Sequence, residues 1–195
     1  MICPICKNTT FENYNGRHLI KCTNCGSLER HRLLYLYLKN ETSFFTATLN
    51  VLHFSPEPFF VKIFKPMKNM TYLGINNARG QWQVDMMQTP FDDNLFDMVI
   101  AIHVLPEVKD DIKAMSDMYR ILNAEGLAIL NVPDFRSKTI ENSTEPLYYR
   151  HYAQNDYIKR LKSVGFNVSV NSYANKMDSK YNLQPNENIY LCRKK

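Results

Sequence analysis

The sequence predicts an α/β fold in which a doubly wound, mostly parallel β-sheet follows a small N-terminal zinc ribbon. Two cysteine pairs with C-x2-C spacing lie within the first 25 residues. From residue 49 onward, short apolar segments alternate with amphipathic segments of helical period, which is the pattern that builds a parallel sheet. We therefore divide the chain into a zinc ribbon (residues 1–27), a connecting helix and linker (28–48) and an α/β domain (49–195).

The composition limits the class of protein. With 195 residues, the chain can form one compact domain of about 150 residues plus a small appendage. Its longest apolar runs, LLYLYL and MVIAIHVL, are far shorter than the ~20 residues that span a bilayer, so we expect a soluble, cytoplasmic protein with no membrane partner. The formal net charge is +5, and the first forty residues hold six Lys/Arg against two Glu. Such basicity permits a nucleic-acid partner without requiring one.

The four N-terminal cysteines form a metal-binding pattern. CPIC and CTNC are separated by fifteen residues, which fits the C-x2-C-x(15–20)-C-x2-C zinc pattern. The segment between them is typical of a hairpin around Asn15-Gly16, and Gly26 suits a sharp turn with positive φ. Four thiolates close the coordination shell, so the metal is predicted to be structural Zn²⁺; four free thiols are the alternative. The predicted ligands are Cys3, Cys6, Cys22 and Cys25.

The next segments predict helices and strands in alternation. Residues 28–39 predict a helix with Ser27 as its N-cap, although LLYLYL also alternates like a strand. The α/β domain then begins, and a helix near residues 56–65 starts at Pro56, where a missing N–H costs nothing. The expected strands of this half are 49–54, 71–76, 81–86 and 96–103, of which the last is a continuous apolar run typical of a central parallel strand.

The second half of the domain continues the pattern. A helix is expected over residues 108–123, where apolar residues recur at steps of four and three. A buried strand follows over 126–133, then a helix over 155–164 that ends at Gly165. FNVSVNSY and NIYLCRK are expected to close the chain as two strands that pair antiparallel at an edge of the sheet. The segments 76–81 and 86–95 are too short for helices, so we expect a trimmed fold with one open flank, where a homodimer could form.

Polar residues at the carboxyl ends of the predicted strands are the candidate site residues. Ligands of open α/β sheets bind at these ends. The candidates are His53, Ser55, Glu57, Asn76, Asp85, Met86 and His103.

Five motifs cover most of the chain: CPIC...CTNCGSLERHR, VLHFSPEP, DMMQTPFDDNLFDMVIAIHVL, DIKAMSDMYRILNAEGLAILNVP and YIKRLKSVGFNV. In these motifs the chain resembles a class I S-adenosylmethionine-dependent methyltransferase (methyltransferase type 11-like) of the small subgroup with an N-terminal four-cysteine zinc ribbon. The block from Asp85 to Pro133 is the most specific part, because its spacing, its PF...FD pair and its EG all match. The resemblance implies a Rossmann-like methyltransferase fold, S-adenosyl-L-methionine as cofactor, and a methyl acceptor that is a small molecule, RNA or protein.

The resemblance also implies residue roles at the adenosine end of the cofactor. Asp85 would accept a hydrogen bond from the adenine amino group, which is sound hydrogen-bond chemistry for a carboxylate. Met86 would lie beside the ring, and Asn76 would face the ribose. Asn76 departs from the acidic residue usual at this strand end, and an amide bonds a hydroxyl more weakly than a charge does. A solvated turn acid is the alternative for Asp85.

The first strand of the domain ends without the glycine-rich turn that most of the superfamily has. HFSPE stands there instead, and relatives in the zinc-ribbon subgroup often have a similar Pro-Glu. A turn without glycine keeps its backbone farther from a ligand, so side chains are expected to hold the methionine end. His53 is assigned to this end, Glu57 to the ammonium and Ser55 to the carboxylate. In the alternative, Pro56 and Glu57 simply start a helix.

His103 and a long loop are the candidates for acceptor binding. His103 ends the central strand, where it is assigned to the cofactor site and as a general base, since an imidazole with a pKa of about 6.5 serves well at neutral pH. A hydrogen-bonded structural histidine is the alternative. The loop over residues 134–154 is long for a compact domain, and its aromatic and positive residues suit a base, a nucleotide or an anion, unless the tyrosines only pack the loop down. The predicted substrate-binding residues are Tyr148, Tyr149, Arg150, His151 and Tyr152.

The sequence therefore predicts an S-adenosylmethionine-dependent methyltransferase of unknown acceptor, with a zinc ribbon that is structural or docks the substrate. The competing hypothesis is a binding module, in which the fold persists without cofactor and recruits RNA or a protein partner. A dinucleotide oxidoreductase is disfavoured because no G-x-G-x-x-G follows the first strand.

Overall fold

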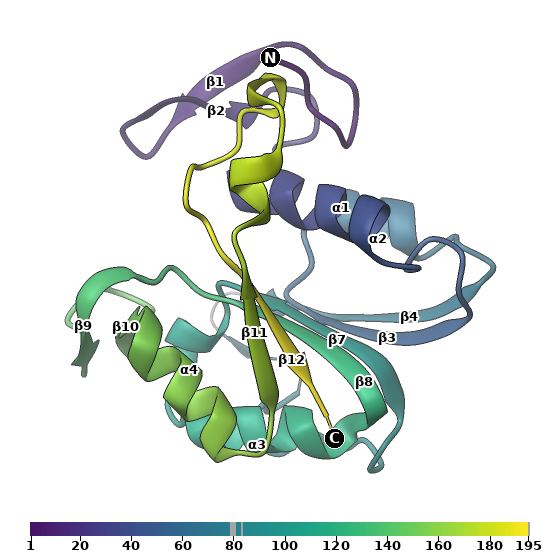
Figure 1. Cartoon of the computed structure of the whole chain (residues 1–195), viewed down its shortest axis with the longest axis vertical. Coiled ribbons are helices and arrows are strands. Elements are labelled where there is room, and N and C mark those ends of the chain that lie inside the picture. The colour runs from purple at the N-terminus through teal and green to yellow at the C-terminus, as the bar shows by residue number, and fades with distance from the viewer. Residues whose placement is uncertain (79–80, 83, 195) are drawn as a thin grey trace. The chain divides into compact units, whose positions relative to one another are not determined.

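The computed structural model describes residues 1–78, 81–82 and 84–194, which fold into two compact units (Figure 1). Unit 1 contains Met1–Ala47 and Asn171–Ile189, and unit 2 contains Thr48–Val170 and Tyr190–Lys195. Within the described residues, no helix has the length and apolar character that crossing a membrane requires.

Unit 1 begins with the expected hairpin. Strands β1 (Phe11–Tyr14) and β2 (Arg17–Cys22) pair antiparallel, with Tyr14 opposite Arg17. The two turn residues, Asn15 and Gly16, have φ of 48° and 74°, and a two-residue hairpin turn of this kind needs positive φ at both positions. The Asn-Gly signal therefore predicted the turn correctly.

Helix α1 (Glu29–Glu41) follows the ribbon, and its start differs from the prediction. The N-cap is Leu28, whose backbone N–H donates to Nδ1 of His31 at 3.1 Å. Ser27 does not cap the helix, because its hydroxyl instead lies 3.2 Å from the sulfur of Cys25. The buried His31 therefore acts as a capping acceptor for this helix.

One buried arginine joins the parts of unit 1. Arg32 of α1 is 0% exposed and lies over the ring of Phe11, 5.1 Å from its centroid. Its guanidinium donates to four backbone carbonyls, those of Ile20, Ser27, Tyr181 and Asn182. The hairpin, the helix and the C-terminal segment thus share one hydrogen-bonding centre, which explains why residues 171–189 belong to this unit.

Unit 2 is built on a six-stranded sheet of order β11-β12-β8-β7-β3-β4. The first four strands along the chain, β3, β4, β7 and β8, run parallel, and β12 runs antiparallel to β8. The prediction of a mostly parallel sheet is therefore confirmed. Its strands are β3 (Leu49–Phe54), β4 (Met70–Ile75), β7 (Phe96–Ile102), β8 (Leu122–Asn131), β11 (Asn167–Asn171) and β12 (Ile189–Arg193).

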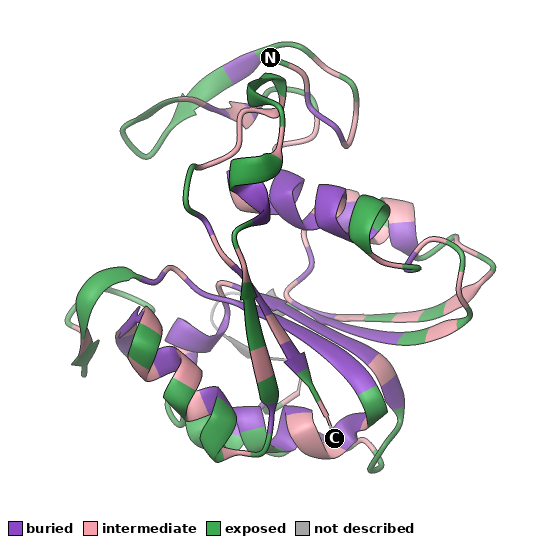
Figure 2. Cartoon of the chain, in the orientation of Figure 1, coloured by how far each residue is buried: buried purple, intermediate pink, exposed green. Residues whose placement is uncertain are grey.

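Three α-helices belong to unit 2: α2 (Pro58–Phe64), α3 (Asp111–Ile121) and α4 (Gln154–Ser163). Helices α3 and α4 lie on one face of the sheet, and their inner sides share a single core with the buried strands β7 and β8 (Figure 2). Helix α3 starts later than predicted, because a 3₁₀ turn, η1 (Leu105–Glu107), precedes it and Asp110 caps it by accepting from the N–H of Lys113 at 3.0 Å.

The segment between β4 and β7 corrects one prediction. Strand β6 covers only Gln81–Trp82 and pairs with β5 (Asn77–Ala78) outside the main sheet, so the expected strand over 81–86 is wrong. From Asp85 the chain turns, since the Asp85 carboxylate accepts from the N–H of Met87. The described residues of this segment form no helix, as expected for a trimmed fold.

The long loop after β8 contains a hairpin that the sequence did not predict. Strands β9 (Phe135–Glu141) and β10 (Arg150–Ala153) pair antiparallel. Strand β9 is exposed along almost its whole length, so it has no alternating buried face that would mark it as a strand in the sequence.

We predict that replacing Arg32 with methionine destabilises unit 1. Each buried carbonyl left without a donor costs about 1–3 kcal/mol, so the free energy of unfolding measured in denaturant should fall by roughly 3 kcal/mol or more. Amide hydrogen exchange should become faster in β2 and near Tyr181. Arg30→Met is the matched control, because the Nε of Arg30 has no hydrogen-bond partner within the described part of the chain. Equal losses in the two variants would contradict the assigned role of Arg32.

Candidate functional site

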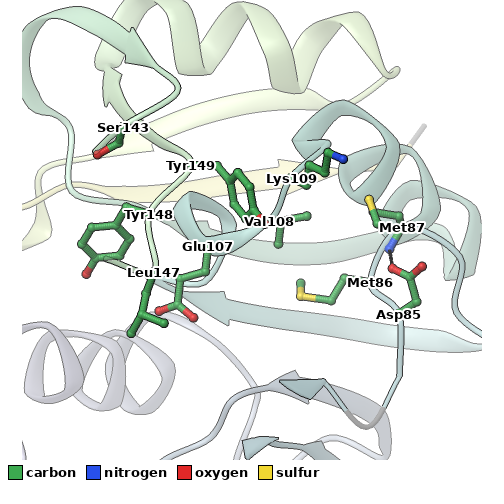
Figure 3. Close-up of a pocket in the computed structure, with 10 residues that line it drawn as sticks. All are labelled: Asp85, Met86, Met87, Glu107, Val108, Lys109, Ser143, Leu147, Tyr148 and Tyr149. Atoms are coloured by element: carbon green, nitrogen blue, oxygen red, sulfur yellow. Dashed lines mark hydrogen bonds between the residues drawn. The ribbon is translucent and has the colours of Figure 1, made fainter. Parts of the chain in front are cut away.

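A cavity of about 520 Å³ lies in unit 2, just beyond the carboxyl end of β7 (Figure 3). Its volume is in the usual range for small-molecule sites, about 300–1,000 Å³. Three segments contribute the walls: the turn after β6, the η1 turn with the residues that follow it, and the loop between β9 and β10. The lining residues are Asp85, Met86, Met87, Glu107, Val108, Lys109, Ser143, Leu147, Tyr148 and Tyr149.

Asp85 and Met86, the residues assigned to adenine, both line this cavity. Asp85 is exposed, and one of its carboxylate oxygens accepts from the N–H of Met87 at 2.8 Å, which closes a tight local turn. Met86 is buried and belongs to the core of unit 2. The turn thus presents one hydrogen-bond acceptor next to an apolar side chain, which suits a heterocycle that carries an amino group.

The turn after β3 contains no glycine, and its conformation depends on serine, on proline and on a glycine of the neighbouring strand. Ser55 adopts the left-handed conformation, with φ of 52°, and its N–H donates to the carbonyl of Ile75 at 2.6 Å. Pro56 then packs against Gly74 of the neighbouring strand β4, where a Cβ would lie 2.9 Å from the proline ring. The residue that must lack a side chain is therefore on β4, and the turn itself uses serine and proline.

His53 does not lie in the cavity wall. The imidazole is 1% exposed and packs near Phe60 of α2, with the hydroxyl of Tyr72 2.9 Å from its Nδ1. Burial raises the pKa of the Tyr72 hydroxyl, so this phenol stays protonated at neutral pH. His53 therefore sits in a hydrogen-bonded, aromatic environment under α2.

The other predicted cofactor residues lie at strand ends but outside the cavity lining. Glu57 is half-buried and occupies the N-cap position of α2, and Asn76 is exposed directly after β4. His103 follows β7 with φ of 58°, and its N–H donates to the carbonyl of Asn131 at 2.8 Å. A non-glycine residue held in the left-handed region costs on the order of 1 kcal/mol or more and is often found at functional sites.

The predicted substrate residues divide into two groups. Tyr148 and Tyr149 line the cavity, whereas Arg150 and Tyr152 are buried outside its lining. His151 lies 3.0 Å from the hydroxyl of Ser143. Backbone hydrogen bonds hold the loop in place, because the N–H of Tyr149 donates to the carbonyl of Pro106 at 2.7 Å. The loop is therefore attached directly to the η1 turn.

Arg150 fastens the β9–β10 hairpin to the cavity wall. Its guanidinium donates to the carbonyls of Val108 at 2.9 Å and Lys109 at 3.0 Å. The same group pairs with Asp111 at 3.4 Å and with Glu141 at 3.1 Å. Burial acts to lower the pKa of Arg150, but Tyr152, Asp111 and Glu141 outweigh it and raise that pKa above its usual value. The guanidinium is therefore a permanent charge inside a satisfied network.

Asp111 is the acidic centre of that network. It is 2% exposed, accepts from the hydroxyl of Tyr152 at 2.8 Å, and pairs with Arg160 of α4 at 3.2 Å. Burial, followed by the charge of Asp111, raises the pKa of Tyr152 well above its usual value. Arg150 and Tyr152 thus act as braces for the hairpin and do not reach the cavity themselves.

Sequence reasoning missed several lining residues. Glu107 and Lys109 stand in and just after the η1 turn, and neither was among the predicted site residues. Ser143 and Leu147 gave no signal, because their approach to the cavity depends on the unpredicted hairpin.

The four cysteines of unit 1 come together as predicted. Their sulfur atoms all lie within 4.8 Å of one another, with Cys3 and Cys25 at 3.7 Å and Cys6 and Cys22 at 3.5 Å. Tetrahedral zinc with Zn–S bonds of about 2.3 Å requires sulfur separations of about 3.8 Å. Burial acts to raise the pKa of Cys22, but hydrogen bonds from the backbone of Cys25 and Asn24 outweigh it, so this pKa falls to about 6. The geometry is compatible with a zinc site.

Comparisons with known proteins confirm the resemblance. Residues 46–130 match the family described as methyltransferase domain. A candidate S-adenosylmethionine-dependent methyltransferase from Listeria monocytogenes superposes with a TM-score of 0.60 at 16% identity, covering 85% of this chain and 99% of that chain. A SAM-dependent methyltransferase from Archaeoglobus fulgidus superposes with a TM-score of 0.58 at 14% identity, covering 84% of this chain and 93% of that chain. The chain thus has an S-adenosylmethionine-dependent methyltransferase-like fold.

One similar structure is described by a different reaction. The 4+2 cyclase SpnF superposes with a TM-score of 0.61 at 14% identity, covering 98% of this chain and 87% of that chain. The fold therefore does not by itself fix the reaction. No curated protein matches the sequence.

We predict that Arg150→Met costs about 3–5 kcal/mol of stability in unit 2, because it leaves buried acceptors without their charged partner. Urea unfolding of the purified chain measures the loss. The matched control in the same hairpin is Arg136→Met, since Arg136 meets Glu145 only at 3.9 Å and both side chains are half-exposed; an exposed pair contributes about 0–1 kcal/mol. Similar losses in both variants would contradict the bracing role of Arg150.

Proposed function

We propose that unit 2 transfers a methyl group from S-adenosylmethionine to an acceptor that binds in the cavity beyond β7. The observation that carries this proposal is the joint presence of Asp85 and Met86 in the wall of a cavity of ligand size. Both residues were assigned to adenine by resemblance alone. The methyltransferase domain match over residues 46–130 supports the same reading.

The chemistry of the Asp85 turn fits the adenosine end of the cofactor. One carboxylate oxygen is used by the N–H of Met87, and the second can accept from an adenine amino group. Met86 offers a polarizable apolar side chain beside the expected position of the ring, and methionine sulfur makes favourable contacts with aromatic groups. Asn76 is the proposed ribose contact, since it is exposed at the end of the neighbouring strand β4.

The turn after β3 is proposed to hold the methionine end. Ser55 can donate its hydroxyl to a carboxylate, and Glu57 can attract an ammonium group. His53 contributes by supporting this turn from the core, through its contacts with Phe60 and Tyr72.

When bound, S-adenosylmethionine supplies an electrophilic methyl group on a sulfonium. The contribution of the protein is then to align the acceptor and to exclude water, which needs no covalent bond to the chain. His103 is the proposed base, because it follows the central strand β7 and its left-handed backbone conformation fixes the position from which the side chain extends.

We also propose that the four cysteines hold a structural Zn²⁺. Four sulfurs fill a tetrahedral shell, so the metal would stabilise the ribbon and take no part in chemistry. The separations between sulfur atoms and the lowered pKa of Cys22 support this assignment.

A binding module without cofactor is the second candidate. Three residues assigned to the cofactor lie outside the cavity lining: His53, Glu57 and His103. This favours the binding module, because the methionine end of a cofactor in the cavity would then contact fewer of the side chains assigned to bind it. In that case the ribbon, with its basic excess, would recruit RNA or a protein partner.

We expect S-adenosylmethionine to bind the purified chain, and Asp85→Asn to weaken binding about ten-fold or more. The amide keeps the local turn but presents a donor or a weaker acceptor to the adenine amino group, a change of about 1–2 kcal/mol. Isothermal titration calorimetry measures both affinities. Asp92→Asn, which changes an exposed acid elsewhere in unit 2, should leave the affinity unchanged. If the native chain binds no cofactor at millimolar concentration, the binding module is the better explanation.

We expect one zinc ion per chain in the purified protein, by elemental analysis. Cys22→Ser should abolish stoichiometric zinc and unfold the ribbon, because metal binding and folding are coupled in such small sites. Cys192→Ser is the control, since this buried cysteine lies in unit 2 and should not alter the zinc content. Full zinc occupancy in Cys22→Ser would rule out the four-sulfur site.

A further inference from the structure

We propose that one end of the cavity is an acceptor site and that the acceptor is a small arylalkylamine, which carries a flat ring and an aliphatic ammonium group. The inference rests on the proposed function, because it assigns the Asp85 end of the cavity to the cofactor and leaves the opposite end for the acceptor. That opposite end is built by the loop Ser143–Tyr149, which we call the strap, together with Glu107.

The cavity has two chemically distinct ends (Figure 3). At one end Asp85, Met86 and Met87 lie together, and the ammonium of Lys109 points to the side of Met87. At the other end the carboxylate of Glu107 lies beside Leu147, and the ring of Tyr148 stands next to them. The acidic and aromatic groups of the strap end are therefore separated from the one lysine in the lining.

The strap is a constrained segment that carries exposed apolar groups. Leu147 is 71% exposed and has φ of 73°, an unusual conformation for a branched residue. Three backbone N–H groups donate hydrogen bonds that hold the strap: Ser143 to the carbonyl of Tyr149 at 2.9 Å, Tyr148 to that of Glu145 at 3.2 Å, and Tyr149 to that of Pro106 at 2.7 Å. Arg150 secures its base from below. Side chains of the strap are thus presented to the cavity from a fixed frame.

The side chains at the strap end select a ring. Tyr148 and Tyr149 both face the cavity, and aromatic rings bind planar partners by stacked or edge-to-face contacts. Val108 and Leu147 supply the apolar surface around them. A saturated ring of the same size is not planar, so it could not make these stacked or edge-to-face contacts.

The charges in the lining select an amine. At the strap end the carboxylate in the lining is that of Glu107, whereas Lys109, the one lysine among the described lining residues, points toward the other end (Figure 3). Tyrosine faces attract cations, and a carboxylate beside them strengthens that attraction at close range. The bound ammonium would have to give up one proton before methyl transfer, and His103 is the proposed base for it. The nitrogen would then form the N–C bond while the S–C bond of the cofactor breaks and S-adenosylhomocysteine leaves. An anionic acceptor would meet repulsion from Glu107 at this end, so a carboxylate or phosphate compound is disfavoured.

The volume selects a small molecule. The cavity of about 520 Å³ is in the range that holds one drug-sized ligand, so the space left beside any part of the cofactor suits only a small acceptor. A nucleic acid or a folded protein would have to insert a single group past the strap. A free compound with one ring and one amino group fits the described walls without such a requirement.

The test uses three matched probes with the full-length chain saturated with S-adenosylhomocysteine. Benzylamine carries both features, cyclohexylmethylamine lacks the flat ring, and phenylacetate reverses the charge. We expect benzylamine to bind, as measured by calorimetry or ligand-observed NMR, with at least five-fold weaker binding of cyclohexylmethylamine and no measurable binding of phenylacetate.

Glu107→Gln and Tyr148→Leu should each weaken the binding of benzylamine about ten-fold while retaining binding of S-adenosylhomocysteine. Tyr14→Leu, which changes an exposed tyrosine of β1, is the control and should change nothing. Thermal melting checks that each variant is folded.

Several results would overturn the inference. Equal affinity for phenylacetate and benzylamine would remove the charge argument, and unchanged affinity in both variants would remove the assigned residues. Displacement of benzylamine by S-adenosylhomocysteine would assign the strap end to the cofactor instead. Binding of S-adenosylhomocysteine without any binding of benzylamine would overturn the acceptor class while leaving the proposed function intact. Amine binding by a chain that does not bind S-adenosylhomocysteine would support the strap site and refute the methyltransferase proposal.

Discussion

The site depends on one buried guanidinium. Arg150, which belongs to the hairpin that carries the strap, contacts a segment about forty residues earlier in the chain. Its partners there are the carbonyls that follow η1 and the buried Asp111 at the start of α3, and within the hairpin it pairs with Glu141. None of these segments forms a ladder with the main sheet at this point, so their relative position rests on side-chain contacts. A planar group with several fixed donors suits this task, because it satisfies carbonyls and carboxylates at once. Lysine, with its single point charge, could not replace that geometry.

The architecture of unit 2 was largely predictable because its signals are local or periodic. FDMVIAI reads as a buried parallel strand since both of its faces are covered, and it is one. Helix α3 carries its apolar residues at helical spacing, and the Asn15-Gly16 turn has the backbone that its residue types favour. The cysteine spacing likewise located a cluster whose sulfurs meet in space. In each case a short stretch of sequence contains the whole physical reason for the structure.

The site was less predictable because its geometry depends on contacts across long sequence distances. His53 ends a strand as expected, yet it is buried, since α2 and Tyr72 cover it. Asp85 was expected within a strand over residues 81–86, but β6 ends at Trp82, and the turn at Asp85 depends on its own carboxylate. Strand β9 of the β9–β10 hairpin is exposed along almost its whole length, so no alternation of apolar and polar residues marks it in the sequence. Glu107 and Leu147 entered the cavity only because that hairpin folds back onto η1.

The contact between Pro56 and Gly74 means that the sequence requirement of the β3 turn is shared by two strands. A bulkier residue on β4 would be tolerated only if the proline ring were also lost, so the two positions should change as a pair among descendants of this chain. A pattern search confined to the turn would report a missing motif and discard a sequence that has this fold. Recognition of such proteins therefore needs covariation between residues eighteen places apart, because the ring of Pro56 occupies the space where a residue other than Gly74 would place its side chain.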